Sequence, residues 1–212
     1  MFRLSFGEIL RFLSACHKMD GMKNEDRPLP LLTRFAGHLR TVNTHRRLVR
    51  INCFKCGLYR QGLTHDLSKY SPSEFLVSVR YYQGWRSPYI REKELYGFSY
   101  GWLHHKGRNR HHWEYWQDMI NGKWIPLPMP FNYVVEMVCD RVAACRVYQK
   151  ENYKKESALE YYLSRNDRLY MHPDTAALLE SILRQIAEDG EDAVFARLRE
   201  QLKDYRNTSH IK

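Results

Sequence analysis

The chain has 212 residues, of which 43% are hydrophobic and 27% are charged, which fits one globular helical domain with a sizeable core and excludes an intrinsically disordered chain. Lysine and arginine outnumber aspartate and glutamate by 34 to 24, so the net charge of +10 favours anionic partners: phosphorylated metabolites, nucleic acid or an acidic membrane surface. No run of 18 apolar residues predicts a transmembrane helix.

Residues 1–30 form the first predicted segment. Charged residues interrupt the apolar stretch in residues 1–16 and no cleavage site follows, which predicts an amphipathic helix that packs on the domain or binds a membrane surface or partner. The polar residues 19–30 contain glycine and proline and predict a linker. The missing secretion signal and the odd number of five cysteines predict a cytoplasmic protein. We interpret the C-x-x-C pair Cys53 and Cys56 as core residues.

Helical spacing of apolar residues predicts a long helix from Leu32 to Cys56 and a short helix over residues 58–66. Residues 71–74 (SPSE) carry a capping hydroxyl, a proline at the first helical position and a glutamate at the third, which predicts a new helix with a capping box. The pair His65-Asp66 therefore lies between two helices, held by rigid elements and still reachable.

The remaining chain is also predicted to be helical, with no convincing β-alternation. The expected elements are a loop over Gln83–Glu94, a helix over Tyr96–His105, a basic loop over residues 106–110, a helix from His111, an irregular stretch over Gly122–Pro130, a helix over Phe131–Gln149, and three further helices, the last two beginning near Pro173 and Glu191. The predicted fold class is all-α. We expect a metal-binding helical domain over residues 31–150, and a C-terminal helical extension over residues 151–212 packed on it.

Imidazole and carboxylate side chains that could converge on a metal ion come from three distant stretches: His45, the pair His65-Asp66, and Asp140. Asp140 lies in an apolar helix, where a carboxylate is costly unless it is paired or binds metal; the alternative is a solvated aspartate. His38 and His45 lie on one helix face about 10 Å apart, which is too far for both to bind the same ion with Asp66, so they are alternative ligands. Distances counted along antiparallel helices from the intervening turn favour His45. His38 would face a substrate or simply pack.

A second histidine cluster flanks the basic loop and consists of His104, His105, His111 and His112. Core packing would require a buried partner for each of the four imidazoles, so this pattern indicates function. Two interpretations stay open. His105 and His112 could hold a second metal ion, as in two-ion phosphoryl transfer. Alternatively the histidines face a substrate phosphate, with His104 and His111 as catalytic groups. The residues expected to clamp that phosphate are Lys106, Arg108 and Arg110.

The set His45, His65-Asp66 and Asp140 resembles the H…HD…D signature of the HD metal-dependent phosphohydrolase superfamily. Lys69, in HDLSK, matches a lysine that lies near the phosphate in members with HD-I-G-K. This resemblance implies an HD-domain-like helical bundle, a bound Mn, Fe, Mg, Ni or Zn ion, and hydrolysis of nucleotides or other phosphate esters.

Three longer runs, GLTHDLSKYSPSEF, WLHHKGRNRHHWEYW and MPFNYVVEMVCDR, more closely resemble an uncharacterised bacterial and phage family of unknown function. That resemblance covers residues 32–188 and implies no activity. Members are sometimes mislabelled catalase, and nothing in this sequence marks a haem ligand or distal site.

We therefore expect a metal-dependent phosphohydrolase that acts on a nucleotide or another small phosphate ester, with Lys69 as a catalytic cation beside the phosphate. The alternative is a non-catalytic module, with a structural metal or none, that binds nucleic acid through the basic helix face of Arg46, Arg47 and Arg50. The sequence does not indicate an oligomeric state.

Overall fold

The computed structural model describes residues 29–209. The chain divides into two compact units, Met1–Pro30 and Leu31–Lys212, and all of the described helices belong to the second unit. The amphipathic helix predicted for residues 1–16 lies outside the described residues, as does the predicted linker except for its last two residues.

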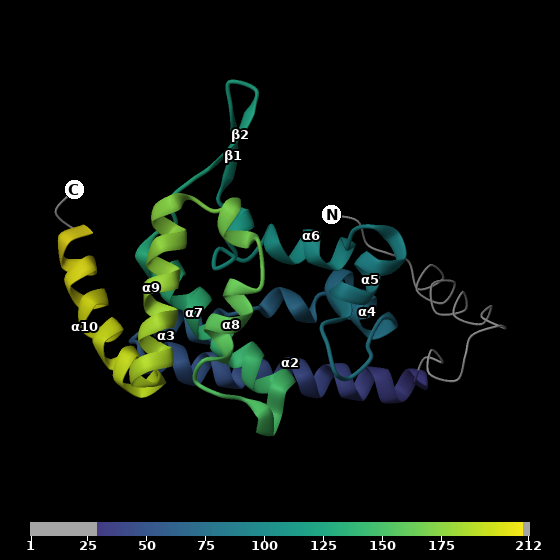
Figure 1. Cartoon of the computed structure of the whole chain (residues 1–212). Helices are drawn as coiled ribbons and strands as arrows, with labels where there is room; N and C mark the ends of the chain where they lie inside the picture. Colours follow the sequence, from purple (N-terminus) through teal and green to yellow (C-terminus); the bar gives the residue numbers. More distant parts are fainter. Residues whose placement is uncertain (1–28, 210–212) are drawn as a thin grey trace. The chain divides into compact units, whose positions relative to one another are not determined.

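Helices dominate residues 29–209 and confirm the all-α prediction. In chain order they are α2 (Leu31–Lys55), α3 (Tyr59–Thr64), α4 (Pro72–Arg80), α5 (Pro88–Tyr96), α6 (Tyr100–Lys106), α7 (Phe131–Gln149), α8 (Ser157–Leu163), α9 (Pro173–Asp189) and α10 (Glu191–Ser209). Within this range the only sheet is a hairpin of β1 (Gln117–Ile120) and β2 (Lys123–Pro126), which projects from the helices in Figure 1. Over the same residues, no helix combines the length and apolarity needed to cross a membrane.

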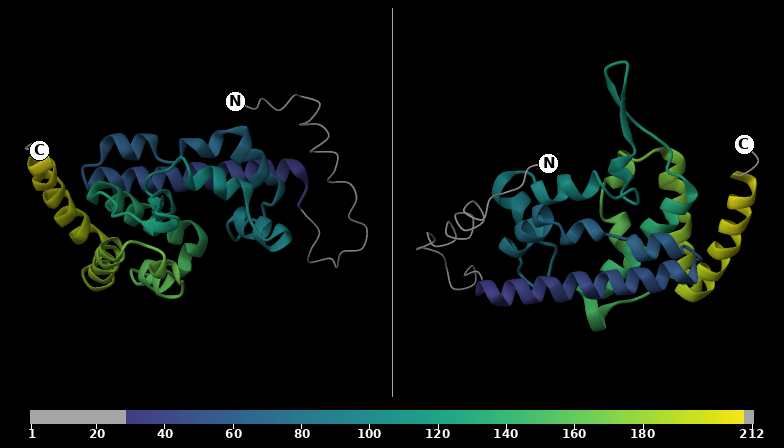
Figure 2. Two further views of the ribbon diagram at one scale, coloured as in Figure 1. Left: turned by 90° about the horizontal axis from the view of Figure 1, so that it is seen from above. Right: turned by 180° about the vertical axis from the view of Figure 1, so that it is seen from behind.

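The turn after α2 brings the His65-Asp66 segment back alongside that helix. Gly57 adopts a left-handed φ of 77°, and the amide of Leu58 donates to the carbonyl of Cys53 at 2.8 Å, which reverses the chain. Helix α3 then packs closely on α2 because Gly62 has no side chain. A Cβ atom at this position would lie only 2.9 Å from the Cβ of Cys53. Figure 2 shows α2 and α3 side by side.

Helix α7 forms the centre of the hydrophobic core. It contacts α2, α8, α9 and α10, and its buried residues extend around most of its circumference. Aliphatic side chains of α9 and the buried Phe195 of α10 complete this core. Cys53 and Cys56 are buried in the same core, which confirms their interpretation as packing residues. Since α7 is held on several sides, it is a rigid support for Asp140, which it carries.

The segment before α6 differs from its prediction. Helix α5 occupies residues 88–94 of the expected Gln83–Glu94 loop and ends at Gly97, which has a left-handed φ of 79°. The helix expected over Tyr96–His105 therefore begins only at Tyr100. Glu92 explains why α5 forms there: it is buried and accepts hydrogen bonds from the Ser99 hydroxyl at 2.5 Å and the Tyr100 amide at 3.0 Å. A tertiary contact, which helical periodicity does not reveal, therefore stabilises this helix.

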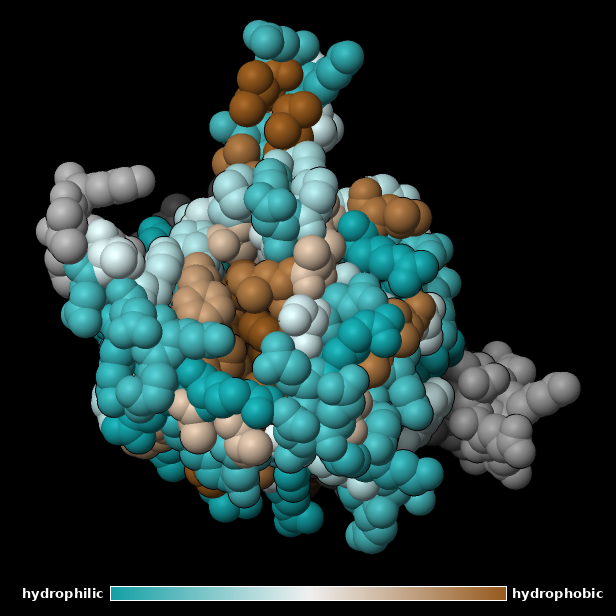
Figure 3. All heavy atoms as spheres, turned by 60° about the vertical axis from the view of Figure 1, so that its left-hand side comes forward, coloured by the Kyte–Doolittle hydropathy of each residue, from teal (hydrophilic) through white to brown (hydrophobic). Residues whose placement is uncertain are grey.

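The hairpin contradicts the helix predicted to open at His111 and the first part of the irregular stretch predicted over Gly122–Pro130, whereas residues 127–130 are irregular as predicted. Only a short 3-10 turn, Trp113–Tyr115, follows His111. Asn121 and Gly122 both have positive φ, of 51° and 75°, as a two-residue hairpin turn requires. In Figure 3 apolar side chains are visible on the hairpin, where Trp124 is 67% exposed. Because most residues of both strands are exposed, the sequence lacks the alternation of apolar and polar residues that marks a half-buried strand.

Candidate metal centre

A strained turn presents the His65-Asp66 pair to the interior. The amide of His65, which caps α3, donates to the carbonyl of Gln61 at 2.7 Å. Asp66 follows with φ 52° and ψ 30°, a left-handed conformation that aspartate tolerates better than most residues. Both residues are at most 2% exposed. Strain at a buried, charged turn is typical of a functional site.

The first group of candidate ligands consists of His45 from α2, His65 and Asp66 from the turn, and Asp140 from α7, with their ligand atoms within 4.8 Å of one another. Nε2 of His45 lies 3.0 Å from Oδ1 of Asp140, and Nε2 of His65 lies 3.2 Å from Oδ2 of Asp66. Metal–ligand bonds of about 2.1 Å separate neighbouring donors by about 3.0 to 3.4 Å. These four side chains therefore have the spacing that one ion requires.

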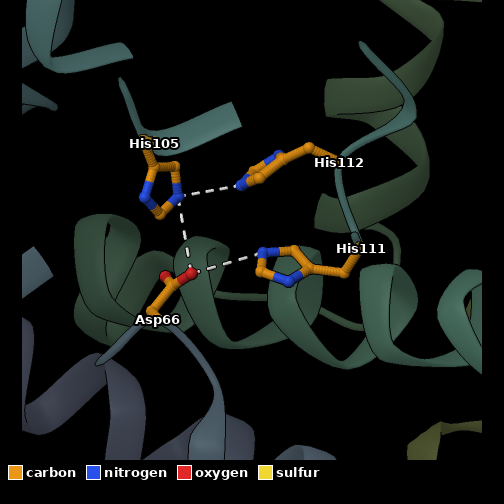
Figure 4. Close-up of side chains that lie close together, drawn as sticks. All are labelled: Asp66, His105, His111 and His112. Carbon is orange, nitrogen blue, oxygen red and sulfur yellow. Dashed lines mark hydrogen bonds and ion pairs between the residues drawn. The ribbon is translucent and has the colours of Figure 1, made fainter. Parts of the chain in front are cut away.

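The second group consists of Asp66, His105 from α6, and His111 and His112 from the segment after it. Figure 4 shows the carboxylate of Asp66 facing the rings of His105 and His111, and Oδ1 lies 3.4 Å from Nε2 of each. The Nε2 atoms of His105 and His112 are 2.8 Å apart. Asp66 thus directs Oδ2 to the first group and Oδ1 to the second, as a carboxylate bridging two metal ions would.

Several ligand atoms of both groups are buried and make no hydrogen bond of good geometry within residues 29–209, although ion-pair contacts join some of them to one another and to Lys69. They are Nε2 of His45, His65 and His111, and both carboxylate oxygens of Asp66. Buried polar atoms are rarely left without a hydrogen bond, and each one costs folding free energy. Because these atoms converge on two points, a cation at each point would satisfy them together. The donor set, imidazole and carboxylate without thiolate, suits Mn, Fe, Ni or Zn; Mg prefers oxygen.

Two buried glutamates hold the far side of the histidine rings. Nδ1 of His65 lies 3.0 Å and Nδ1 of His111 lies 3.3 Å from Oε1 of Glu136. Glu74 contacts Nδ1 of His104 at 2.6 Å and Nδ1 of His105 at 2.9 Å. An imidazole that donates from Nδ1 keeps its Nε2 lone pair for a metal. The grouping of His65, His111 and Glu136 is therefore best interpreted as orienting hydrogen bonds, not as a third ion site.

Glu74 corrects a sequence prediction. Its expected role was to close a capping box with Ser71, but the Ser71 side chain makes no capping hydrogen bond. Glu74 instead points into the interior, with 0% exposure, and contacts the two histidines of α6. Glu136 was not identified from the sequence. The available signal was its position four residues before Asp140, which puts both carboxylates on one face of α7.

Contacts with histidines and Lys69 outweigh burial and lower the pKa of the four carboxyls at the centre, which are Asp66, Glu74, Glu136 and Asp140. Burial alone would raise the pKa of Asp66, but His65, Lys69 and His105 hold it well below its usual range. The pKa of Glu136 falls to about 2, since contacts with His111 and His65 outweigh burial. Burial lowers the pKa of His105 and His112, which keeps both rings neutral and able to bind a metal.

The cationic residues predicted to act on the substrate separate into two sets. Lys69 is at the centre, with Nζ 2.7 Å from Oδ2 of Asp66. Arg108 and Arg110 are exposed and Lys106 is half-buried; none belongs to either ligand group. Arg110 instead donates to the Tyr133 hydroxyl at 3.3 Å. The basic loop is thus a surface feature beside the two groups.

Two predicted histidines also lie outside both groups. His38 is buried and packs against the rings of Phe75 and Tyr82, with centroid distances of 5.0 and 5.9 Å. His104 is held by Glu74 and its side chain is 20% exposed. His111, expected as a catalytic group, belongs to the second ligand group with His105 and His112.

Comparison with known protein families matches residues 34–185 to a family of unknown function, DUF5662. No curated protein matches the chain. No solved structure matches it either.

Proposed function

Because the chain belongs to a family of unknown function, DUF5662, its activity must be inferred from the site itself, and we propose a metal-dependent phosphohydrolase that acts on a nucleotide or another small phosphate ester. One observation carries this proposal: a buried aspartate, Asp66, contributes one carboxylate oxygen to each of two groups of imidazole ligands. Two divalent ions held in this way would supply Lewis-acid stabilisation of the phosphoryl oxygens and a nucleophilic hydroxide at neutral pH.

The residues around the two groups have complementary roles. Lys69 neutralises negative charge that develops on the phosphate, a role that suits a half-buried cation held against Asp66 at the centre. Its pKa is raised because Asp66 and Asp140 outweigh the effect of burial, so it stays protonated. His104, held through Nδ1 by Glu74, is proposed as the proton donor to the leaving group.

Exposure suggests the side from which the substrate enters. The side chains of Asp140 and Lys69 are 17% and 19% exposed, whereas those of His65 and Asp66 are 0% and 1% exposed. Solvent therefore reaches the first ligand group past Asp140 and Lys69. The net charge of +10 attracts anionic substrates to the chain as a whole.

The test is phosphate release from a panel of nucleotides and simple phosphomonoesters by the metal-loaded protein, with Mn²⁺ as the first ion tried. We expect turnover that ends on addition of a chelator and falls at least a thousandfold in Asp66→Asn. His172→Ala alters a half-buried histidine that caps α9 and lies outside both groups, and it serves as the matched control, which should retain full activity once circular dichroism shows that it is folded. Metal-independent turnover, or full activity in Asp66→Asn, would refute the proposal.

A nucleic-acid-binding module receives less support. Arg46 of the expected basic face donates to the carbonyls of His65 at 2.8 Å and Leu63 at 3.1 Å. These hydrogen bonds stabilise the His65-Asp66 turn and occupy the guanidinium that would bind a phosphate. Arg47 and Arg50 remain exposed on α2. Binding to DNA or RNA that weakens steeply with salt and is lost in Arg47→Ala/Arg50→Ala would favour this alternative.

A further inference from the structure

We propose that Glu136 couples the two metal positions by orienting one histidine ligand of each, whereas Glu74 serves the second position alone. The inference rests on the two-ion centre proposed above and concerns how that centre is assembled. It assigns Glu136 and Glu74 as positioning residues, which act through the histidines and do not contact the ions.

One oxygen of Glu136 serves both positions. Oε1 lies 3.0 Å from Nδ1 of His65, a ligand of the first group, and 3.3 Å from Nδ1 of His111, a ligand of the second. The two rings lie against each other, with centroids 4.3 Å apart. A shift of this carboxylate therefore moves or reprotonates one ligand of each group at once.

The other oxygen of Glu136 is fixed by Gln61. The amide nitrogen of Gln61 donates to Oε2 of Glu136 at 2.7 Å and to the carbonyl of Asn132 at 3.1 Å. In Glu136→Gln, the new amide would turn its oxygen toward the Gln61 donor and its NH₂ group toward the two imidazoles. The rings would then have to accept at Nδ1 and carry their proton on Nε2, the nitrogen that faces the metal.

Glu74 contacts a ligand of only one metal position. Its carboxylate contacts Nδ1 of His105, which is a ligand of the second group, and Nδ1 of His104, which belongs to neither group. No contact joins Glu74 to His45, His65 or Asp140 among the ion pairs and hydrogen bonds of residues 29–209. Loss of this carboxylate should weaken the second position and spare the first.

The experiment measures Mn²⁺ affinity by calorimetry, without substrate, in two single-position backgrounds. His45→Ala impairs the first position and reports on the second; His112→Ala impairs the second position and reports on the first. We expect Glu136→Gln to weaken Mn²⁺ binding about tenfold to a hundredfold in both backgrounds. Glu74→Gln should have the same effect in the His45→Ala background and no effect in the His112→Ala background.

Each of the other outcomes overturns the coupling. A Glu136→Gln effect confined to one background, or a Glu74→Gln effect in both, contradicts the assignment, and so does a wild-type chain that binds no Mn²⁺. Circular dichroism establishes that each variant is folded. Should Glu136→Gln fail to fold, Glu136→Asp replaces it, because the shorter carboxylate keeps the charge but cannot reach both rings, and weaker binding in both backgrounds is again required.

The readout separates this inference from the proposed activity. A chain that shows the expected affinity pattern but hydrolyses no phosphate ester would retain the coupling and lose the phosphohydrolase function. A chain that hydrolyses phosphate esters but shows independent positions would retain the function and lose the coupling.

Discussion

Divalent metal should stabilise the fold against heat, and replacement of Asp66 by asparagine should remove most of that stabilisation. Asparagine is the suitable substitution because it tolerates the left-handed φ of 52° at this position and has nearly the same shape. It removes the charge and the second strong ligand oxygen. Since Asp66 serves both groups, one substitution weakens both positions.

The expected magnitude follows from linkage. An ion present at a hundred times its Kd stabilises the folded state by about 2.7 kcal/mol, so two ions give about 5 kcal/mol. For a domain of this size each kcal/mol shifts Tm by about 2 to 4 °C, which predicts a rise of about 10 to 20 °C. Asp66→Asn should lose most of this rise. Asp140→Asn, a ligand of the first group only, should keep about half of it.

The assay is thermal unfolding by circular dichroism with and without Mn²⁺, after removal of metal by a chelator. His38→Gln is the matched control, because His38 is a buried histidine of the same helix, seven residues before His45, and belongs to neither group. Its metal-dependent rise in Tm should equal that of the wild type. An unchanged rise in Asp66→Asn, or equal losses in Asp66→Asn and Asp140→Asn, would refute the bridging role of Asp66.

Three further predictions concern the surroundings of the centre. Burial and the charge of Lys69 lower the pKa of His38 from 6.5 to about 4. In the metal-free protein His38 therefore lowers the free energy of unfolding by about 3 kcal/mol as the pH falls from about 6.5 to 4. Urea unfolding at pH 7 and pH 4.5 should show that His38→Gln loses less stability at the lower pH than the wild type does. Gly37→Ala should lower the free energy of unfolding by about 1 to 3 kcal/mol, because the new Cβ would lie 2.6 Å from Cε1 of Tyr82; in a Tyr82→Ala background the same change should instead stabilise, by about 1 kcal/mol. Arg46→Met removes the donor to the carbonyl of His65 and should cost about 1.5 to 3 kcal/mol in urea unfolding, while the exposed Arg47→Met should stay within about 0.5 kcal/mol of the wild type.

The helices that carry the first ligand group could be predicted because their signals are local. The expected helix Phe131–Gln149 matches α7 at both ends, and the expected Leu32–Cys56 helix differs from α2 by one residue at each end. Turn geometry favoured His45 over His38, and the structure brings His45 to the ligand group that contains Asp66. Periodicity, a turn glycine and helix length were sufficient for these features.

The second ligand group depends on contacts that no local pattern encodes. His104 and His105 are neighbours on α6 and point about 100° apart, so only the packing of α6 determines which of them reaches Asp66. Glu74 has the sequence context of a capping residue, but its carboxylate contacts the two histidines of α6 instead. The hairpin was missed because its strands expose apolar side chains and lack the alternation of a half-buried sheet.

The charges at the centre explain why cations would complete this fold. Asp66, Glu74 and Glu136 are each at most 5% exposed. Within residues 29–209 a single lysine, Lys69, forms an ion pair with one of these carboxylates, that of Asp66, and no arginine does. Several buried carboxylates close together cost free energy unless positive charge offsets them. Without metal, protons bound to the histidines must supply this positive charge. Burial alone would lower the pKa of His65, but the carboxylates of Asp66, Asp140 and Glu136 raise it well above 6.5. Two divalent ions would replace such protons, so metal affinity, proton release and stability depend on the same few side chains.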